Sequence, residues 1–316
     1  MANVYNSSGG IITRAYNSNG ELLTMCYDSQ GNQLRKGHAV SNNVTRSLLM
    51  IPDIPTGTQG FACDSITQTI AQFYTGYMYF IDITDGSAVK SNNINLGHGH
   101  TGQFAPTKTA DQEYPLLYVS GPNETVNEIY YTYMLEIGCE TNTAITQKVY
   151  AVPANSTRTS CRTVVDFENN IVYHVSAETY YGTADYTYIT AWDMNSSELL
   201  DGATFNSAPI YALTHKLDEF QVPFIPEIQS CTFFDGLIVL LSDKSGAANK
   251  YYQFVDVEMQ DVYLTIDKTA LMLSGELEGV GFMYNNSTGK YDMIVSHRTS
   301  DGAGSYVTEF HRYEFN

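Results

Sequence analysis

Positive charge is scarce in this 316-residue chain, which has 16 Lys and Arg against 34 Asp and Glu and a formal net charge of −18. Binding to nucleic acid needs clustered Lys and Arg, and the sequence has no basic run. The longest apolar stretches are strand-sized, and the N-terminus lacks the charged and apolar regions of a secretory signal. We therefore expect no nucleic-acid partner, no membrane insertion and no export by the standard route.

Motifs that bring cofactors or catalytic nucleophiles are also missing. There is no Gly-rich phosphate loop, no Ser in a strand-turn-helix elbow and no Cys pair with zinc-finger spacing. The five cysteines are odd in number and scattered, which favours reduced thiols over a disulfide framework. No segment shows helical periodicity of the needed length, whereas 25 Tyr and 14 Phe suit half-buried strands. The sequence therefore predicts an all-β chain without a cofactor or a structural metal.

What the chain does have is one short phrase repeated five times, an apolar residue, a carboxylate and an apolar residue. The carboxylates are spaced 54, 57, 63 and 58 residues apart, and they are Asp82, Glu136, Asp193, Asp256 and Glu314. Upstream of each lie a strand ending in a hydroxyl residue and, before that, a run of small or apolar residues. Short antiparallel strands at this period are typical of β-propeller blades. We predict a five-bladed β-propeller over residues 59–316; an open array of five units and a β-sandwich are the alternatives.

A fourth strand is predicted after the phrase in the first four units, at 87–89, 144–152, 198–200 and 261–266. The fifth unit reaches only its third strand, residues 305–315. An unpaired edge would remain at the ring seam, so an N-terminal segment should supply the missing strand. Residues 38–58 are a linker, and within it Val44 to Met50 is the best candidate. The five phrase carboxylates are expected at the ends of third strands, pointing to solvent or capping turn amides.

Residues 1–37 contain three consecutive 11-residue repeats, each of which resembles a strand, a tight Asn/Ser/Gly turn and a return strand. Three such hairpins bury too little apolar surface to fold alone. We interpret them as an anchor that docks on another protein or self-associates; a leader or a flap on the propeller is the alternative. The docking residues would be Tyr5, Ile12, Tyr16, Leu23, Tyr27 and Leu34.

Candidate ligand-binding residues fall into two groups. His98 and His100 lie at i and i+2 before an inner strand and point to the same side, without a nearby third ligand for a metal. Alignment of the blades places five polar residues just before the innermost strands: Gln59, His100, Arg162, Gln229 and Glu278. They either bind a sugar, ion or water chain in the channel or satisfy one another there. Tyr180 and Tyr181, in a loop of the third unit, are candidates for sugar stacking.

Carboxylates near the axis raise an enzymatic alternative, because five-bladed glycoside hydrolases use such groups as acid, base and nucleophile. The candidates are Asp64, Asp166 and Glu278. Asp64 and Asp166 align with the outer ends of first strands, where turn residues are the simpler interpretation. Fold alone does not separate an enzyme from a binding protein.

The segment from Leu96-Gly97-His98 to Phe104, the Tyr- and Asn-rich blades and the Ser/Gly/Asn turn repeats resemble tail-associated or other virion proteins of bacteriophages. The resemblance covers about residues 59–316, and His100 replaces the asparagine usual near the histidine. It implies a non-enzymatic virion component assembled in the bacterial cytoplasm. Residues 1–37 would attach it to other virion proteins, and the β-domain would contact host-surface glycans.

Overall fold

A computed structural model describes residues 26–27, 33–34, 38, 40–41, 43–55, 59–99, 101–140, 142–179, 184–243, 250–267, 276–300 and 306–315. The chain forms two compact units, Met1–Ser41 and Asn42–Asn316. All regular structure in the described ranges is β-strand. Nothing in these ranges is a helix with the length and apolarity needed to cross a membrane.

The first unit contains one short hairpin in its described part. Strand β1 (Cys26–Tyr27) pairs antiparallel with β2 (Gln33–Leu34), and Tyr27 lies opposite Gln33. This is the hairpin predicted for the third 11-residue repeat. The anchor residues Tyr5, Ile12, Tyr16 and Leu23 lie outside the described residues.

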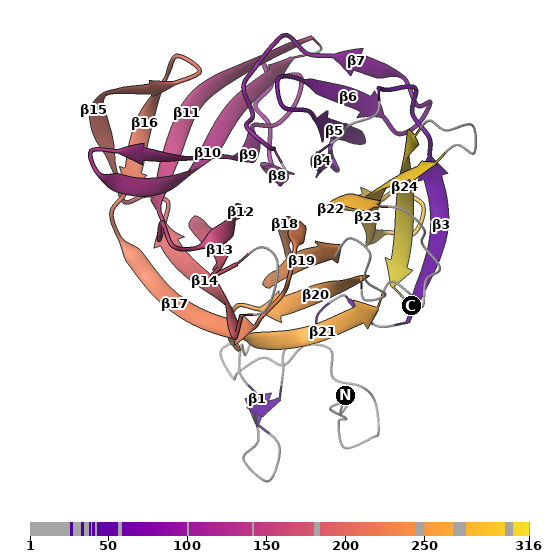
Figure 1. The fold of residues 1–316 in the computed structure, drawn as a ribbon. Helices are drawn as coiled ribbons and strands as arrows, with labels where there is room; N and C mark the ends of the chain where they lie inside the picture. Colours follow the sequence, from indigo (N-terminus) through magenta and orange to yellow (C-terminus); the bar gives the residue numbers. More distant parts are fainter. Residues whose placement is uncertain are drawn as a thin grey trace, which may run out of the picture. The chain divides into compact units, whose positions relative to one another are not determined.

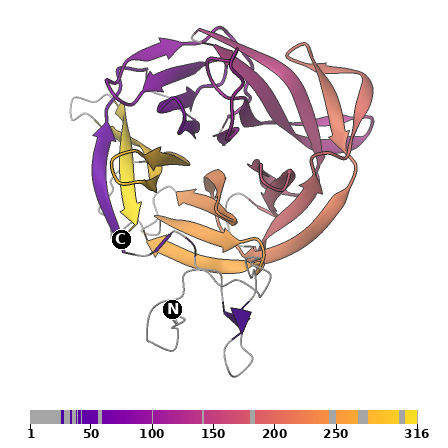
Figure 2. The same ribbon diagram turned by 180° about the vertical axis from the view of Figure 1, so that it is seen from behind.

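The second unit is a ring of five sheets around an axis (Figures 1 and 2), which confirms the predicted five-bladed propeller. Blade 1 is β4 (Phe61–Asp64), β5 (Thr69–Phe73), β6 (Met78–Asp82) and β7 (Ala88–Lys90). Blade 2 is β8 (Gly102–Phe104), β9 (Leu117–Val126), β10 (Ile129–Glu140) and β11 (Thr143–Pro153). Blade 3 is β12 (Thr159–Asp166), β13 (Ile171–Ala177), β14 (Tyr186–Asp193) and β17 (Lys216–Pro223). Blade 4 is β18 (Ile228–Phe234), β19 (Leu237–Asp243), β20 (Lys250–Asp256) and β21 (Asp261–Asp267).

Blade 5 closes the ring with a strand from the opposite end of the second unit. Its strands are β22 (Glu276–Asn285), β23 (Lys290–Ser300), β24 (Tyr306–Phe315) and, outermost, β3 (Val44–Met50). Strand β3 runs antiparallel to β24, with Val44 opposite Phe315 and Met50 opposite Phe310. The ring-closing strand predicted at Val44 to Met50 is therefore confirmed.

One predicted strand assignment is wrong. Residues 198–200 do not form the fourth strand of blade 3; they belong to β15 (Ser197–Phe205), which forms a hairpin with β16 (Ala208–Leu213). Strand β16 pairs in parallel with β11, so this hairpin extends blade 2 to six strands (Figure 1). The fourth strand of blade 3 is β17, which pairs antiparallel with β14 after the hairpin ends. The prediction failed because the hairpin is an insertion between β14 and β17 that pairs with a strand of another blade.

Apolar contacts between neighbouring blades hold the ring together. Phe61 of blade 1 meets Phe310 of blade 5 edge to face, with 5.3 Å between ring centroids. Gly279 in β22 makes room for this packing, because a Cβ atom there would lie 2.5 Å from the Phe61 ring. Similar buried clusters join blades 1 and 2 and blades 3 and 4. Burial of this apolar surface is the main favourable term in folding.

Three of the five phrase carboxylates cap turns at strand ends, as predicted. Asp82 accepts from the Thr84 amide at 2.7 Å, Asp193 from the Asn195 amide at 2.9 Å, and Asp256 from the Glu258 amide at 2.9 Å. Each of the three ends its strand and caps the turn that follows. Glu136 differs, because β10 continues to Glu140 and leaves no turn to cap. Its Oε2 accepts from the hydroxyls of Tyr118 at 2.8 Å and Tyr150 at 3.4 Å.

Candidate functional site

The polar residues predicted at the axis lie at the starts of inner strands and contact neighbouring segments. Gln59 Oε1 lies 3.4 Å from His98 Nδ1. Arg162 Nη2 donates to the Ile228 carbonyl of blade 4 at 3.4 Å. Glu278 is buried, whereas Gln229 is half-buried. None of these four described residues lines either of the two cavities described below.

Three further candidates lie outside the described residues: His100, Tyr180 and Tyr181. Ligand binding by His100 and sugar stacking by Tyr180 and Tyr181 therefore stay predictions.

A side chain of blade 2 links the inner strands of three blades. Gln103 Nε2 donates to the carbonyls of Val165 in blade 3 at 3.2 Å and of Phe233 in blade 4 at 3.3 Å. Its Oε1 accepts from the Val165 amide at 2.7 Å. Thr101, two residues earlier, accepts from the Cys231 amide of blade 4 at 3.1 Å. Blade 2 is thus bonded to the inner strands of two other blades.

Two of the three carboxylates proposed for the enzymatic alternative bond groups of turns, whereas the third, Glu278, lies within β22. Asp64 Oδ1 accepts from the Ile66 amide at 2.8 Å, and its Oδ2 accepts from the Thr67 amide at 3.2 Å. Asp166 Oδ1 accepts from the Glu168 amide at 3.1 Å, and its Oδ2 from Asn169 Nδ2 at 2.8 Å. These bonds stabilise the first hairpin of blade 1 and of blade 3.

His297, Glu309 and His311 are the described residues that come close enough together to hold a metal ion. His311 Nε2 lies 2.8 Å from Glu309 Oε2, and Arg46 Nε donates to His311 Nδ1 at 3.2 Å. Because the guanidinium is always a donor, Nδ1 is unprotonated and the ring proton lies on Nε2, facing Glu309. A metal on Nε2 would move that proton to Nδ1, against Arg46. The cluster therefore fits a hydrogen-bonded chain across the ring seam better than a metal site.

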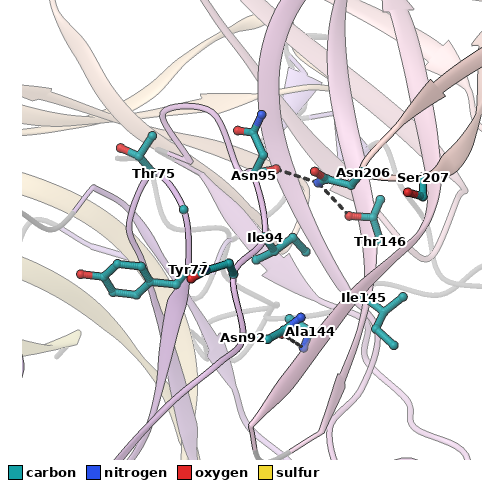
Figure 3. Close-up of a pocket in the computed structure, with 12 residues that line it drawn as sticks. Thr75, Tyr77, Asn92, Ile94, Asn95, Ala144, Ile145, Thr146, Asn206 and Ser207 are labelled. Carbon is teal, nitrogen blue, oxygen red and sulfur yellow. Dashed lines mark hydrogen bonds between the residues drawn. The ribbon is translucent and has the colours of Figure 1, made fainter.

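A groove of about 770 Å³ lies between blades 1 and 2 (Figure 3). Its walls are the β5–β6 turn at Thr75 to Tyr77, the connection at Asn92 to Asn95, the start of β11 at Ala144 to Thr146, and the tip of the inserted hairpin. We call it the asparagine groove. The connection is held in place from both sides, because the Ile94 amide donates to the Gly76 carbonyl and the Asn92 amide to the Asn142 carbonyl, both at 2.9 Å.

The hairpin tip fits into the groove through one side chain. Asn206 Nδ2 donates to the Asn95 carbonyl at 2.8 Å and to Thr146 Oγ1 at 3.0 Å, as Figure 3 shows. Asn206 and Ser207 have φ angles of 50° and 66°. Positive φ at both central residues is the mark of a two-residue type I′ turn, which Asn tolerates well. This turn places an amide from the blade 3 part of the sequence beside blade 1.

The groove offers neutral hydrogen-bonding groups. Thr75, Asn92, Asn93, Asn95 and Ser207 are exposed. Among the described residues, the lining includes no carboxylate, amine, guanidinium or imidazole group. The Tyr77 ring points away from the asparagines in Figure 3, and it stacks on Tyr74 with 4.6 Å between centroids. The groove can therefore bind an uncharged, hydroxyl-rich molecule through amides and hydroxyls.

The groove residues were not among the candidates from the sequence. One sequence feature that could have indicated them is the longest interval between phrase carboxylates, 63 residues, because this interval contains the inserted hairpin. Asn206-Ser207 between two strand-like runs also marks a tight turn. Neither signal indicates which blade the hairpin joins.

Comparisons with known proteins give similarities at the level of the fold. No protein-family model and no curated protein matches the chain. The tail fiber of Staphylococcus aureus phage P68 is 11% identical with a TM-score of 0.49, covering 86% of this chain. This chain spans 53% of the length of that fiber.

Two sugar dehydrogenases are similar to the same extent. A putative glucose dehydrogenase from Thermus thermophilus is 11% identical with a TM-score of 0.46, covering 86% of this chain and all of its own. The PQQ-bound aldose sugar dehydrogenase of Streptomyces coelicolor is 8% identical with a TM-score of 0.46, covering 87% of this chain and all of its own. Similarities this low assign no activity.

Proposed function

We propose that this protein is a non-enzymatic component of a bacteriophage virion, a tail or appendage protein whose propeller binds a neutral host-surface glycan in the asparagine groove. One observation carries the glycan part: the groove is lined by amides and hydroxyls and, in the part of the chain that the structure describes, by no ionic side chain. Sugar hydroxyls both donate and accept, and Asn amides offer both functions on one side chain. The groove volume of about 770 Å³ is within the usual range for ligand sites.

The virion part follows from the resemblance of the sequence to phage virion proteins and from the layout in two units. An N-terminal unit ends at Ser41, ahead of the propeller. In this proposal the N-terminal unit attaches to other virion proteins, and the propeller presents the groove to the host surface.

The non-enzymatic part is supported by the bonding of Asp64 and Asp166, whose carboxylates cap turns. The glycoside hydrolase alternative predicts loss of hydrolysis in Asp64→Asn, Asp166→Asn or Glu278→Gln variants. Under the proposed function, the full-length protein releases no sugar from the glycan that it binds.

The test is binding to an array of neutral and anionic bacterial-surface glycans, followed by titration of the best neutral glycan. We expect Asn206→Gly to weaken binding about fivefold or more, since the loss of one hydrogen-bonding amide costs about 1 kcal/mol. Gly keeps the positive-φ turn at low strain. Asn93→Ala, at an exposed groove position, should also weaken binding.

Asn127→Gly is the matched control. Asn127 has the same φ of 50° in the exposed β9–β10 turn and lies outside the groove. Its variant should bind as the wild type does. Capture of anionic glycans alone, or equal binding by the Asn206→Gly and wild-type proteins, would contradict the proposal.

A further inference from the structure

A second cavity, of about 470 Å³, lies at the other ends of the inner strands from the predicted axis residues. All five blades contribute to it. Blade 1 gives Asp64, Ser65 and Ile66, and aromatic rings come from the other four: Phe104, Phe167, Phe233, Phe234, Phe282 and Tyr291. We call this cavity the aromatic basin.

Gln103 is part of the basin lining, and its side chain joins blades 2, 3 and 4 through its bonds to Val165 and Phe233. A concave, mostly apolar site of this size suits a compact small molecule.

The rings are already arranged for stacking. Phe234 and Phe282, from blades 4 and 5, lie parallel, with 4.0 Å between centroids and 3° between planes. Tyr291 lies 5.1 Å from Phe234 and is 45% exposed. Ile66, in the turn that follows β4 of blade 1, is 48% exposed. Apolar and aromatic side chains that stay open to solvent in a concavity mark an interaction site.

Three polar side chains of the basin, Gln103, Asp64 and Ser65, already have partners within the protein. Gln103 bonds backbone groups at both ends of its amide. Asp64 caps the Ile66 and Thr67 amides, and Ser65 Oγ accepts from the Tyr284 amide at 3.0 Å. A ligand thus finds ring faces and few free hydrogen-bonding groups. The described lining residues include no Lys, Arg or His, and Asp64 disfavours an anion.

From these observations we infer that the aromatic basin is a second ligand site, which takes a small uncharged molecule with an aromatic or other apolar ring. Its chemistry is opposite to that of the asparagine groove, where hydrogen bonds would do the binding. The inference does not depend on the glycan proposal, because the two sites share no lining residue among those described.

The test uses the full-length protein and the neutral fluorescent probe N-phenyl-1-naphthylamine. We expect saturable binding at one site per chain with enhanced emission. Tyr291→Ala removes an exposed ring and should weaken binding about three- to tenfold, the range for one aromatic contact. Phe282→Leu keeps apolar volume but removes the stacked ring, and it should weaken binding similarly.

Two control variants keep the readout specific. Tyr291→Phe retains the ring, and Asn206→Gly changes only the groove, so both should bind the probe as the wild type does. Thermal melting checks that each variant is folded. Non-saturable binding, or wild-type affinity in folded Tyr291→Ala and Phe282→Leu variants, overturns the inference. Displacement of the probe by a glycan that binds the protein also overturns it, because the basin would then be the sugar site.

Discussion

At the scale of single residues, His174 shows how the contact between blades 2 and 3 depends on a neutral side chain. Thr132 Oγ1 donates to Asn123 Oδ1 at 2.8 Å, so it accepts from His174 Nε2, 3.0 Å away. Burial and, to a smaller extent, the nearby Arg158 together lower the pKa of His174 to about 4. The folded protein therefore holds this imidazole neutral under conditions in which the unfolded chain would protonate it.

This pKa predicts a loss of stability in acid. Because the folded pKa lies below the ordinary value of 6.5, the contribution is fully present above about pH 6.5 and is lost as the pH falls toward 4. Between pH 7.5 and pH 4.5 the free energy of unfolding should fall by about 2–3 kcal/mol from this group. Urea unfolding at several pH values measures it.

His174→Gln is the comparison variant, since Gln donates a hydrogen bond but does not titrate in this range. Between pH 7.5 and pH 4.5 the free energy of unfolding of this variant should fall by about 2–3 kcal/mol less than that of the wild type. The pKa of His311 is also lowered, chiefly by burial. The wild type and the His174→Gln variant both keep this second contribution, which also lowers stability in acid. Equal pH dependence in the two proteins would contradict the assignment to His174.

At the scale of elements, β3 decides whether the ring is closed. It covers the edge of β24 from Phe310 to Phe315, and its Arg46 donates to His311 across the seam. Without β3 the backbone groups of that edge would be open to pairing with another chain.

Two truncations test this. A chain that begins at residue 42 keeps β3, whereas a chain that begins at residue 51 loses it. We expect the shorter chain to melt about 10 °C or more below the longer one and to aggregate, because a whole strand of a large domain contributes several kcal/mol. Calorimetry and light scattering measure both effects. Similar melting of the two chains would show that β3 is dispensable for closure.

The inserted hairpin β15–β16 forms the outer edge of blade 2 and builds a wall of the groove. Strand β16 pairs with the outer strand β11 of blade 2, at residues such as Ile210. Replacing residues 195–213 by Asn-Gly should let β14 connect directly to β17. We expect a folded propeller with a melting temperature a few degrees lower, since buried Ile210 and Ala208 are lost.

The same deletion should abolish the glycan binding proposed for the groove, while probe binding in the aromatic basin should persist. Circular dichroism, melting and the two binding assays measure the outcome. Retained glycan binding would place the sugar site elsewhere. A collapsed fold would show that the hairpin is part of the core.

At the scale of the whole molecule, the N-terminal unit and the propeller are separate compact units. Hairpins as short as the β1–β2 pair are marginally stable in isolation. Ordering each residue costs about 1–2 kcal/mol, which such a small unit does not recover without docking. We therefore expect the N-terminal unit to supply attachment and the propeller to supply binding.

If the proposed virion role holds, deleting residues 1–41 should leave a soluble propeller with an unchanged melting temperature that no longer joins the phage particle. A particle-incorporation assay compared with the full chain checks this, and the chain beginning at residue 42 serves for both truncation experiments. If the deletion unfolds the propeller or leaves incorporation unaffected, the anchoring hypothesis fails.

Much of the propeller could be predicted because the evidence for it is periodic. Five copies of the carboxylate phrase imply five similar units, and the missing fourth strand of the last unit implies closure by the segment containing Val44. Turn-capping by Asp82, Asp193 and Asp256 follows from their position at strand ends. These features depend on local spacing and on the alternation of side chains along a strand.

The candidate sites could not be predicted in the same way, because each joins residues that are distant in sequence. Asn206 reaches the groove only because β16 pairs with β11, and the basin exists only where rings from four blades meet Ile66 of the first. The sequence by itself determined the number of blades and the seam, since both depend on repeats and strand order. The tertiary structure alone decided where the inserted hairpin docks and which side chains face a common cavity. The reason is physical: pairing and packing between distant strands are chosen by contacts that no local pattern encodes.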